Sequence, residues 1–306
     1  MSKKIRIGTR ESQLALWQAN RVKMLLKHQG VDAELIPIKS EGDIDLQTPL
    51  YAMGVQGIFT RSLDLALLND QIDLAVHSMK DVPVRLPEGI IEAAILERDN
   101  PFDLLVPHPS VPAFVLEDHS PVTIASSSLR RRAQWLYRFP EDQVEGIRGN
   151  VNTRLRKLEN SNWSGAIFAS AGLERIGMRP PQAIELKWMI PAPAQGAILV
   201  VCLEKKTSLL DQCRSLHHED TACCVKIERD FLAGLLGGCS TPIGALAELD
   251  GDEIYFRGNL LDNAGEKMFA IEKRISTELA APLGTAAAHE LLRNGASQIL
   301  GNKQHA

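Results

Sequence analysis

Arginine and serine side chains in this sequence stand where predicted strands end, which makes them the first candidates for chemistry. Arg10 and Ser12 follow a strand predicted at 5–8, and Ser78 follows one predicted at 72–76. Helix N-termini have unpaired N–H groups that bind anions, and arginine pairs with carboxylates or phosphates through two hydrogen bonds. The same placement recurs after the strands of a second predicted sheet, in Ser126, Ser127, Ser128, Arg130, Arg131, Arg148 and Arg154.

A single arginine of this kind is more often a solvated helix residue, so the prediction depends on the set as a whole. Open α/β sheets bind their ligands at the carboxyl ends of the strands. Because all of these residues fall at strand ends, the set predicts a site for a ligand with several negative charges.

Asp81 and Cys239 are candidates for more specific roles. Asp81 stands beside Lys80 among the cationic residues, where a carboxylate can transfer a proton or stabilise a cation. A helix cap or an ion-pair partner is the alternative for Asp81. Cys239 follows two glycines and precedes Pro242, which favours an accessible thiol on a turn. The residues alone leave an inert, buried Cys239 equally open.

The other cysteines and the histidines give no sign of a metal site. Five cysteines, an odd number without regular spacing, favour neither a disulfide framework nor a zinc site. Cys223 and Cys224 fall in a helical pattern, where we expect packing or surface positions. His217 and His218 lack a second pair at metal-ligand spacing, so we expect no metal.

Composition and charge indicate a globular protein of 306 residues, 44% hydrophobic and 24% charged, with two or three domains. The net charge of -4 gives the whole chain no electrostatic reason to bind nucleic acid or an anionic membrane. The sequence shows no apolar stretch near the roughly 20 residues of a membrane helix and no signal-peptide core. We therefore expect a cytoplasmic protein.

Hydrophobic periodicity alternates strands and helices through the first two thirds of the chain. Strands predicted at 5–8, 33–38 and 72–76, separated by helices at 14–26 and 59–68, indicate an α/β domain with a mainly parallel sheet. The polar, glycine-bearing segment 40–57 lacks a period and is typical of a lid or binding loop. Prolines between 101 and 121 mark a crossing into a second domain, with strands at 122–125, 144–147 and 166–169.

A buried strand at 197–203 could return the chain to the first sheet. A helical stretch at 217–236 follows and ends at two glycines. Strands at 253–261 and 267–275 and a helix around 278–300 complete a small α+β domain.

In these segments the sequence resembles the porphobilinogen deaminase (hydroxymethylbilane synthase) family over essentially its whole length. The matching motifs, in order, are IGTRESQLALWQA at 7–19, DLAVHSMKDVP at 73–83, SSLRR at 127–131, RGNVNTRL at 148–155, AGLER at 171–175, PAQG at 193–196, HHE at 217–219 and GGCSTPIG at 237–244. Agreement of so many motifs in one order is far more specific than any single motif.

The resemblance implies two lobes like those of type II periplasmic binding proteins, with mainly parallel sheets, and a small C-terminal α+β domain. The implied division is a first lobe of residues 1–98 with 195–216, a second lobe of 102–192, and a C-terminal domain of 219–306 that carries the cofactor cysteine. It also implies a cytoplasmic monomer of heme biosynthesis that joins four porphobilinogen units, releases ammonia and frees linear hydroxymethylbilane by hydrolysis.

The implied cofactor is a dipyrromethane joined by a thioether to Cys239, on which the chain of pyrroles grows. Asp81 matches the catalytic carboxylate, which assists deamination and stabilises the cationic azafulvene. Each pyrrole carries acetate and propionate groups. The implied cofactor contacts are Ser78, Lys80, Asp81, Ser126, Ser127, Ser128, Arg130, Arg131 and Arg148, and the implied substrate contacts are Arg10, Ser12, Gln18, Arg148, Arg154 and Arg175.

Two departures from the family pattern concern charge. Ala52 and Gln56 stand where many relatives have lysines in the lid segment, and Val201 with Cys202 replaces a usual Ile-Glu. A non-catalytic two-lobed protein that binds anions or solutes is the main alternative, but it gives Cys239 no role. A thiol hydrolase is a weaker one, because no Cys-His-Asn arrangement is identifiable.

Overall fold

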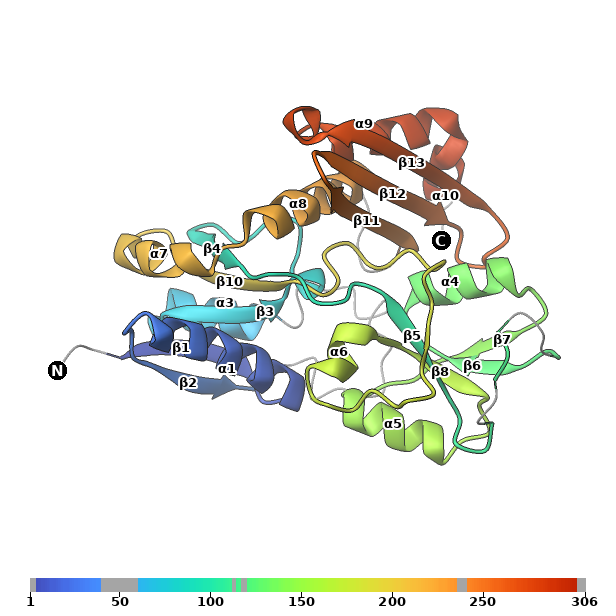
Figure 1. The fold of residues 1–306 in the computed structure, drawn as a ribbon, viewed down its shortest axis with the longest axis horizontal. Helices are drawn as coiled ribbons and strands as arrows, with labels where there is room; N and C mark the ends of the chain where they lie inside the picture. The colour runs from blue at the N-terminus through green and yellow to red at the C-terminus, as the bar shows by residue number, and fades with distance from the viewer. Residues whose placement is uncertain (1–3, 40–59, 112–113, 117–119, 236–240, 302–306) are drawn as a thin grey trace.

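The structure, a computed structural model, describes residues 4–39, 60–111, 114–116, 120–235 and 241–301. These residues form two five-stranded sheets flanked by helices and one three-stranded sheet (Figure 1). The expected fold class, two α/β lobes with a small C-terminal α+β domain, is confirmed.

The first sheet has the strand order β2-β1-β3-β10-β4. β1 pairs in parallel with β2 and β3, whereas β10 pairs antiparallel with β3 and β4. The elements of this lobe are β1 (Ile5–Arg10), α1 (Gln13–His28), β2 (Ala33–Ile38), α3 (Arg61–Leu68), β3 (Leu74–Ser78), the 3-10 helix η2 (Met79–Asp81), β4 (Ile90–Ile95), β10 (Ile198–Leu203), α7 (Thr207–Cys213) and the 3-10 helix η3 (Arg214–Leu216). The predicted return of the chain at 197–203 is thus confirmed as β10.

Helices cover both faces of the first sheet. Val22 and Leu26 of α1 pack on one face, and Leu63 and Leu67 of α3 pack on the other together with Val225. Every residue of β10 is buried, because helices cover the sheet on both faces. A strand in this position needs apolar side chains throughout. This packing fixes the positions of β1 and β3, whose carboxyl ends carry candidate site residues.

The second sheet repeats the arrangement with the order β7-β6-β8-β5-β9. β6 pairs in parallel with β7 and β8, and β5 pairs antiparallel with β8 and β9. Trp135 and Leu158, from its two longer helices, lie in separate hydrophobic clusters. The elements are β5 (Asp103–Pro107), β6 (Thr123–Ala125), α4 (Leu129–Arg138), β7 (Gln143–Glu145), α5 (Val151–Glu159), β8 (Gly165–Ala169), α6 (Ser170–Glu174) and β9 (Ile184–Glu185).

The third sheet is antiparallel with the order β11-β12-β13, and two helices pack against it (Figure 1). Gly284 allows these helices to approach closely, because a Cβ there would lie 2.1 Å from the Ile227 carbonyl oxygen. The elements are α8 (Glu219–Gly234), β11 (Ile243–Asp250), β12 (Glu253–Leu261), β13 (Met268–Ser276), the 3-10 helix η4 (Thr277–Leu279), α9 (Leu283–Leu291), the π-helical turn η5 (Leu292–Ala296) and α10 (Ser297–Gly301). No helix in the described ranges is both long and apolar enough to cross a membrane.

Two crossover segments connect the lobes, one between β4 and β5 and one between β9 and β10. They contact each other at Gly196, whose φ of 88° and close approach to the Asp99 carbonyl oxygen both exclude a Cβ. Glu228 of α8 lies fully buried against both segments. Its carboxylate accepts hydrogen bonds from the Arg98 guanidinium at 2.6 Å and from the Ala194 N–H at 2.6 Å.

Some predicted elements are wrong in detail. The proline-rich crossing contains β5, and two further strands, β4 and β11, were not predicted. The single helix predicted at 278–300 is interrupted, because Pro282 precedes α9 and Gly295 has a φ of 104°. The strand predicted at 72–76 lies two residues further on, as β3, so His77 is part of it.

The buried Glu228–Arg98 pair yields a stability prediction. Glu228→Ala leaves the largely buried Arg98 guanidinium without its carboxylate, so the free energy of unfolding should fall by about 3 to 5 kcal/mol. Denaturant unfolding measures this change. Asp230→Ala, which breaks the more exposed pair with Lys226 on the same helix, is the control and should cost less than about 1 kcal/mol. Equal losses in the two variants would contradict the importance of this pair.

Candidate functional site

The carboxyl edge of the first sheet gathers predicted site residues around a small pocket of about 70 Å³. Ser12 caps α1 by accepting a hydrogen bond from the Ala15 N–H. The Gln18 amide of α1 donates to the Ser78 hydroxyl at 2.8 Å and ties α1 to the end of β3. The predicted residues that line the pocket are Arg10, Ser12, Gln18, Ser78 and Asp81.

His77 also lines this pocket, although it is not among the predicted site residues. Gly8 of β1 is opposite Ala75 of β3, so two residues further along these parallel strands Arg10 and His77 are neighbours on one face. Burial, together with the charge of Arg10, lowers the pKa of His77 to about 4. A neutral imidazole therefore stands beside the arginine at neutral pH.

The turn that carries Lys80 and Asp81 is held from the C-terminal domain. Arg229 of α8 is buried and donates hydrogen bonds to the Val82 carbonyl oxygen at 3.1 Å and to the Pro83 carbonyl oxygen at 2.7 Å. These carbonyls follow Asp81 directly in the chain. The helix that leads toward the predicted cofactor cysteine thus also fixes the backbone beside the predicted catalytic carboxylate.

The second lobe presents its predicted residues on the N-terminal parts of α4 and α5. The Ser128 side chain caps α4 by accepting from the Arg131 N–H, and the Ser127 hydroxyl donates to the Ile147 carbonyl oxygen. Arg154 lies on α5 and donates to the Gly149 carbonyl oxygen at 2.7 Å. Ser126 is buried directly after β6, and Arg148 lies between β7 and α5.

Asp103, at the start of β5, holds the two arginines of α4 and was missed from the sequence. Its fully buried carboxylate lies 2.8 Å from Arg130 Nη2 and 2.7 Å from Arg131 Nη2. Burial alone would raise the pKa of the Asp103 carboxyl, but both arginine charges hold it well below its usual range. Asp103 is far from Arg130 and Arg131 in the chain, so no local sequence pattern predicts these ion pairs.

Lys80, Arg130, Arg131, Arg148 and Arg154, here called the basic cluster, come together from both lobes. Burial lowers the pKa of Lys80 to about 8, while the charge of Asp81 opposes the shift. Burial, with the charges of Arg131 and Arg148, lowers the pKa of Arg154 to about 10. The structure therefore brings the predicted residues of the two lobes within electrostatic reach of one another and of Asp81.

The basic cluster suits a ligand that carries carboxylates. Its cations outnumber the nearby carboxylates of Asp81 and Asp103, and burial lowers the pKa of the Arg130 guanidinium. The Arg130 Nε atom is buried without a hydrogen-bond acceptor among the described residues. Anionic groups would supply the missing acceptors and charge, which is the chemistry of a dipyrromethane with acetate and propionate side chains.

Arg175 lies apart from the basic cluster in its contacts. Its guanidinium donates to the Asp99 carboxylate at 2.7 Å and to the Gly196 carbonyl oxygen at 2.5 Å, so it joins α6 to both crossover segments. Two further predictions, the cofactor cysteine and the lid segment, cannot be compared with the structure. Cys239 and the lid segment with Ala52 and Gln56 lie outside the described residues.

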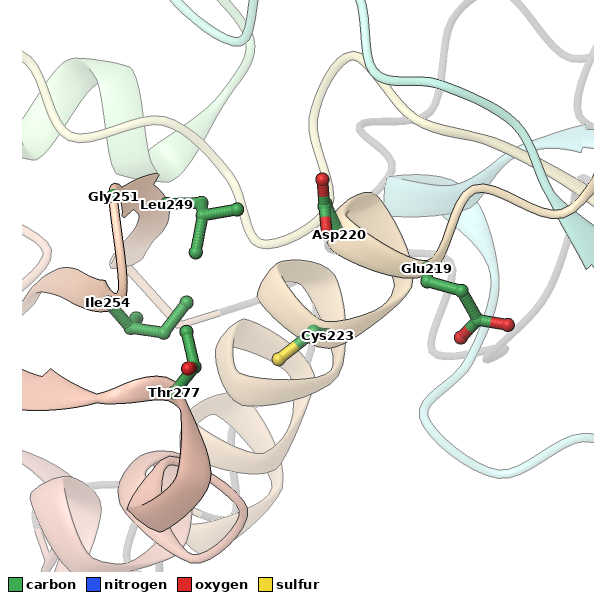
Figure 2. A pocket seen from close by; sticks show the side chains of 7 residues that line it. All are labelled: Glu219, Asp220, Cys223, Leu249, Gly251, Ile254 and Thr277. Carbon is green, nitrogen blue, oxygen red and sulfur yellow. The ribbon is translucent and has the colours of Figure 1, made fainter.

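A second cavity of about 380 Å³ lies between the start of α8 and the β11–β12 hairpin (Figure 2). Its lining includes Cys223 but none of the predicted site residues. Cys223 is exposed and Cys224 is buried, as the helical pattern predicted. In the described ranges, no three His, Cys, Asp or Glu side chains are grouped as a metal site requires.

Fold and site together define a two-lobed α/β protein with a cluster of basic side chains between its lobes. A family model described as "Porphobilinogen deaminase, dipyromethane cofactor binding domain" matches residues 5–211, and one described as "Porphobilinogen deaminase, C-terminal domain" matches residues 222–293. The chain belongs to the porphobilinogen deaminase family. It is a transferase of tetrapyrrole biosynthesis that makes hydroxymethylbilane from porphobilinogen and uses a dipyrromethane cofactor.

Several solved structures are similar at low identity. A periplasmic substrate-binding protein of an ABC transporter from Coxiella burnetii is 14% identical, with 71% of this chain and 93% of that chain covered and a TM-score of 0.43. The periplasmic VFT2 domain of BvgS from Bordetella pertussis is 13% identical, with 71% and 89% covered and a TM-score of 0.42.

The neutral state of His77 yields a pH prediction. The unfolded chain takes up a proton at this residue near pH 6.5, whereas the folded chain does so only near pH 4. The free energy of unfolding should therefore fall as the pH drops through this range, by about 3 kcal/mol at most from His77. Urea unfolding between pH 4 and 7 measures the slope, which His77→Gln should flatten. The control His28→Gln removes an exposed histidine and should keep the wild-type slope; identical slopes in both variants would refute the assignment.

Proposed function

We propose that Asp81 is the catalytic carboxylate and that the basic cluster binds the carboxylates of cofactor and substrate. The observation that carries this proposal is the position of Asp81: it lies at the strand edge of the first lobe, and its charge acts on both Lys80 and Arg154. One carboxylate thus faces cations from both lobes. Arg10, Ser12 and Gln18 line the same pocket and are proposed to bind the incoming porphobilinogen.

These residues can assist the binding, deamination and coupling of each porphobilinogen. Arginine and serine donors orient the substrate through its acetate and propionate groups. The Asp81 carboxylate accepts hydrogen bonds from the aminomethyl and pyrrole nitrogens and stabilises the positive charge that develops as the carbon–nitrogen bond breaks. Asp81 can then accept the proton released after the new carbon–carbon bond forms. When bound, the dipyrromethane supplies the pyrrole carbon to which the first substrate is joined.

The proposal also includes the covalent link to the cofactor, the domain boundaries, the location in the cell and the oligomeric state. We propose a thioether at Cys239, and lobes of 1–98 with 195–216 and of 102–192 beside a C-terminal domain of 219–306, which the three separate sheets support. A cytoplasmic location is supported by the free thiols of the four described cysteines. The proposed cofactor contacts include Ser126, Ser127 and Ser128, and Arg175 is a proposed substrate contact. The monomeric state stays a prediction.

Substitution of Asp81 tests its role. Asp81→Asn keeps the shape of the side chain but removes its charge and its proton acceptor, so kcat should fall by about 100-fold or more. Steady-state assays with porphobilinogen measure the loss. Asp142→Asn, at a buried carboxylate that accepts from Trp135 Nε1, is the matched control and should keep its turnover. Normal turnover in Asp81→Asn would remove this residue from the mechanism.

The intact mass of the denatured protein tests the proposed thioether. Protein from cells that make porphobilinogen should exceed the mass of its sequence by two linked pyrrole units, and Cys239→Ser should lose this excess. Cys223→Ser, at an exposed thiol in the second cavity, is the control and should retain it. A protein that stays unmodified after incubation with porphobilinogen or hydroxymethylbilane would favour the non-catalytic binding protein. An excess that persists in Cys239→Ser would place the link at another residue.

A further inference from the structure

Gln195 lies where the second crossover enters the first lobe, and its side chain is almost completely buried, with 1% exposure. The backbone on either side is unusual, because Ala194 has a φ of 60° and Gly196 a φ of 88°. The Gln195 carbonyl oxygen accepts a hydrogen bond from Arg98 Nε at 2.8 Å. This conformation turns the Gln195 side chain toward the charged residues between the lobes.

The Gln195 amide joins a cation of one lobe to a carboxylate of the other. Its Oε1 accepts from Lys80 Nζ at 3.1 Å. Its Nε2 donates to Asp103 Oδ1 and to the Pro101 carbonyl oxygen, both at 2.8 Å. The orientation of the amide is therefore determined, because the reverse orientation would direct N–H donors at an ammonium and an oxygen at a carboxylate.

No charged residue could replace Gln195 without cost. Glutamate would direct a carboxylate at Asp103, and lysine would direct an ammonium at Lys80. A neutral amide satisfies both partners because it has a donor and an acceptor at its two ends. Asp103 in turn holds Arg130 and Arg131, so a continuous chain of contacts runs from Lys80 through Gln195 and Asp103 to both arginines.

The charged groups around Lys80 come from three elements. Asp81 follows it in η2, Asp103 stands at the start of β5, and Arg130 and Arg131 project from α4. The two carboxylates favour the Lys80 ammonium, whereas burial and the two arginines disfavour it. The Gln195 amide oxygen adds a hydrogen-bond acceptor to these charges, at 3.1 Å from Lys80 Nζ.

We propose that Gln195 is a positioning residue that keeps Lys80 charged and directed toward the site, and aligns it with Arg130 and Arg131 across the two lobes. The importance of this alignment for catalysis rests on the function proposed above for the basic cluster. The contact chain itself does not, because it can be tested through the chemistry of the Lys80 amine.

The first experiment measures the reactivity of the Lys80 amine against pH. Lys80 is partly exposed, so a brief pulse of acetic anhydride at a series of pH values, followed by peptide mass spectrometry, reports its deprotonated fraction. Gln195→Leu removes the acceptor and should lower the midpoint of Lys80 by about one pH unit. Gln195→Glu replaces the acceptor with a carboxylate and should raise the midpoint.

Gln134→Leu is the matched control. Gln134 is also a buried amide beside a crossover segment, where it accepts from the Ile190 N–H and donates to the Ile190 carbonyl oxygen. Its hydrogen bonds within the described residues go to Ile190 and Asn259 and not to Lys80 or Asp103, so its loss should leave the Lys80 midpoint unchanged. Because Gln195→Leu and Gln195→Glu should shift the midpoint in opposite directions, a general loosening of the structure cannot imitate the expected pair of results.

Equal Lys80 midpoints in the wild type and in both Gln195 variants would overturn the proposal, as would equal shifts in Gln195→Leu and Gln134→Leu. If Gln195→Leu does not fold, the direction of the shift in Gln195→Glu decides. The second experiment measures kcat/KM against pH for the cofactor-loaded enzyme, and the alkaline limb should move with the Lys80 midpoint. A Lys80 midpoint that moves while the alkaline limb stays in place would uphold the contact chain but contradict the proposed role of Lys80 in binding.

Discussion

The site depends on the ion pairs that the buried carboxylate of Asp103 forms with Arg130 and Arg131. Two adjacent arginines on the first turn of a helix repel each other, and burial makes the charge of Arg130 still less favourable. Asp103 offsets both effects, because it lies within 3 Å of Arg130 and Arg131 and is itself fully buried. One carboxylate between two cations leaves a net positive charge in a place shielded from water. That excess is what a ligand rich in carboxylates can neutralise.

The C-terminal domain takes part in the site through two consecutive residues of α8. Glu228 binds Arg98 and the Ala194 N–H, so it joins the two crossover segments. Arg229 binds the carbonyl oxygens that follow Asp81. The domain proposed to carry the tethered cofactor therefore also positions the turn beside Asp81 and the connection between the lobes. Such contacts explain why a small third domain packs against the crossovers and not at the far end of either lobe.

Much of the fold followed from the sequence, because its periodicity is strong where helices cover both faces of a sheet. The strands predicted at 5–8, 33–38 and 197–203 are present as β1 (Ile5–Arg10), β2 (Ala33–Ile38) and β10 (Ile198–Leu203). The placement of Arg10, Ser78 and Asp81 at the carboxyl edge of the sheet agrees with the prediction. The strand β5 was missed, because prolines stand on both sides of its short apolar run. The helix predicted at 278–300 was broken by Pro282 and by the left-handed backbone of Gly295, whose effects a periodicity analysis underrates.

The sequence by itself determined most of the alternation of strands and helices, the helix caps at Ser12 and Ser128, and the family, since these depend on neighbouring residues or on motifs in a fixed order. Only the tertiary structure decided which charges meet. Asp103 reaches Arg131 over 28 positions, and Lys80 reaches Gln195 over 115. Partners so far apart leave no periodic pattern in the sequence, because they come into contact only in the folded structure.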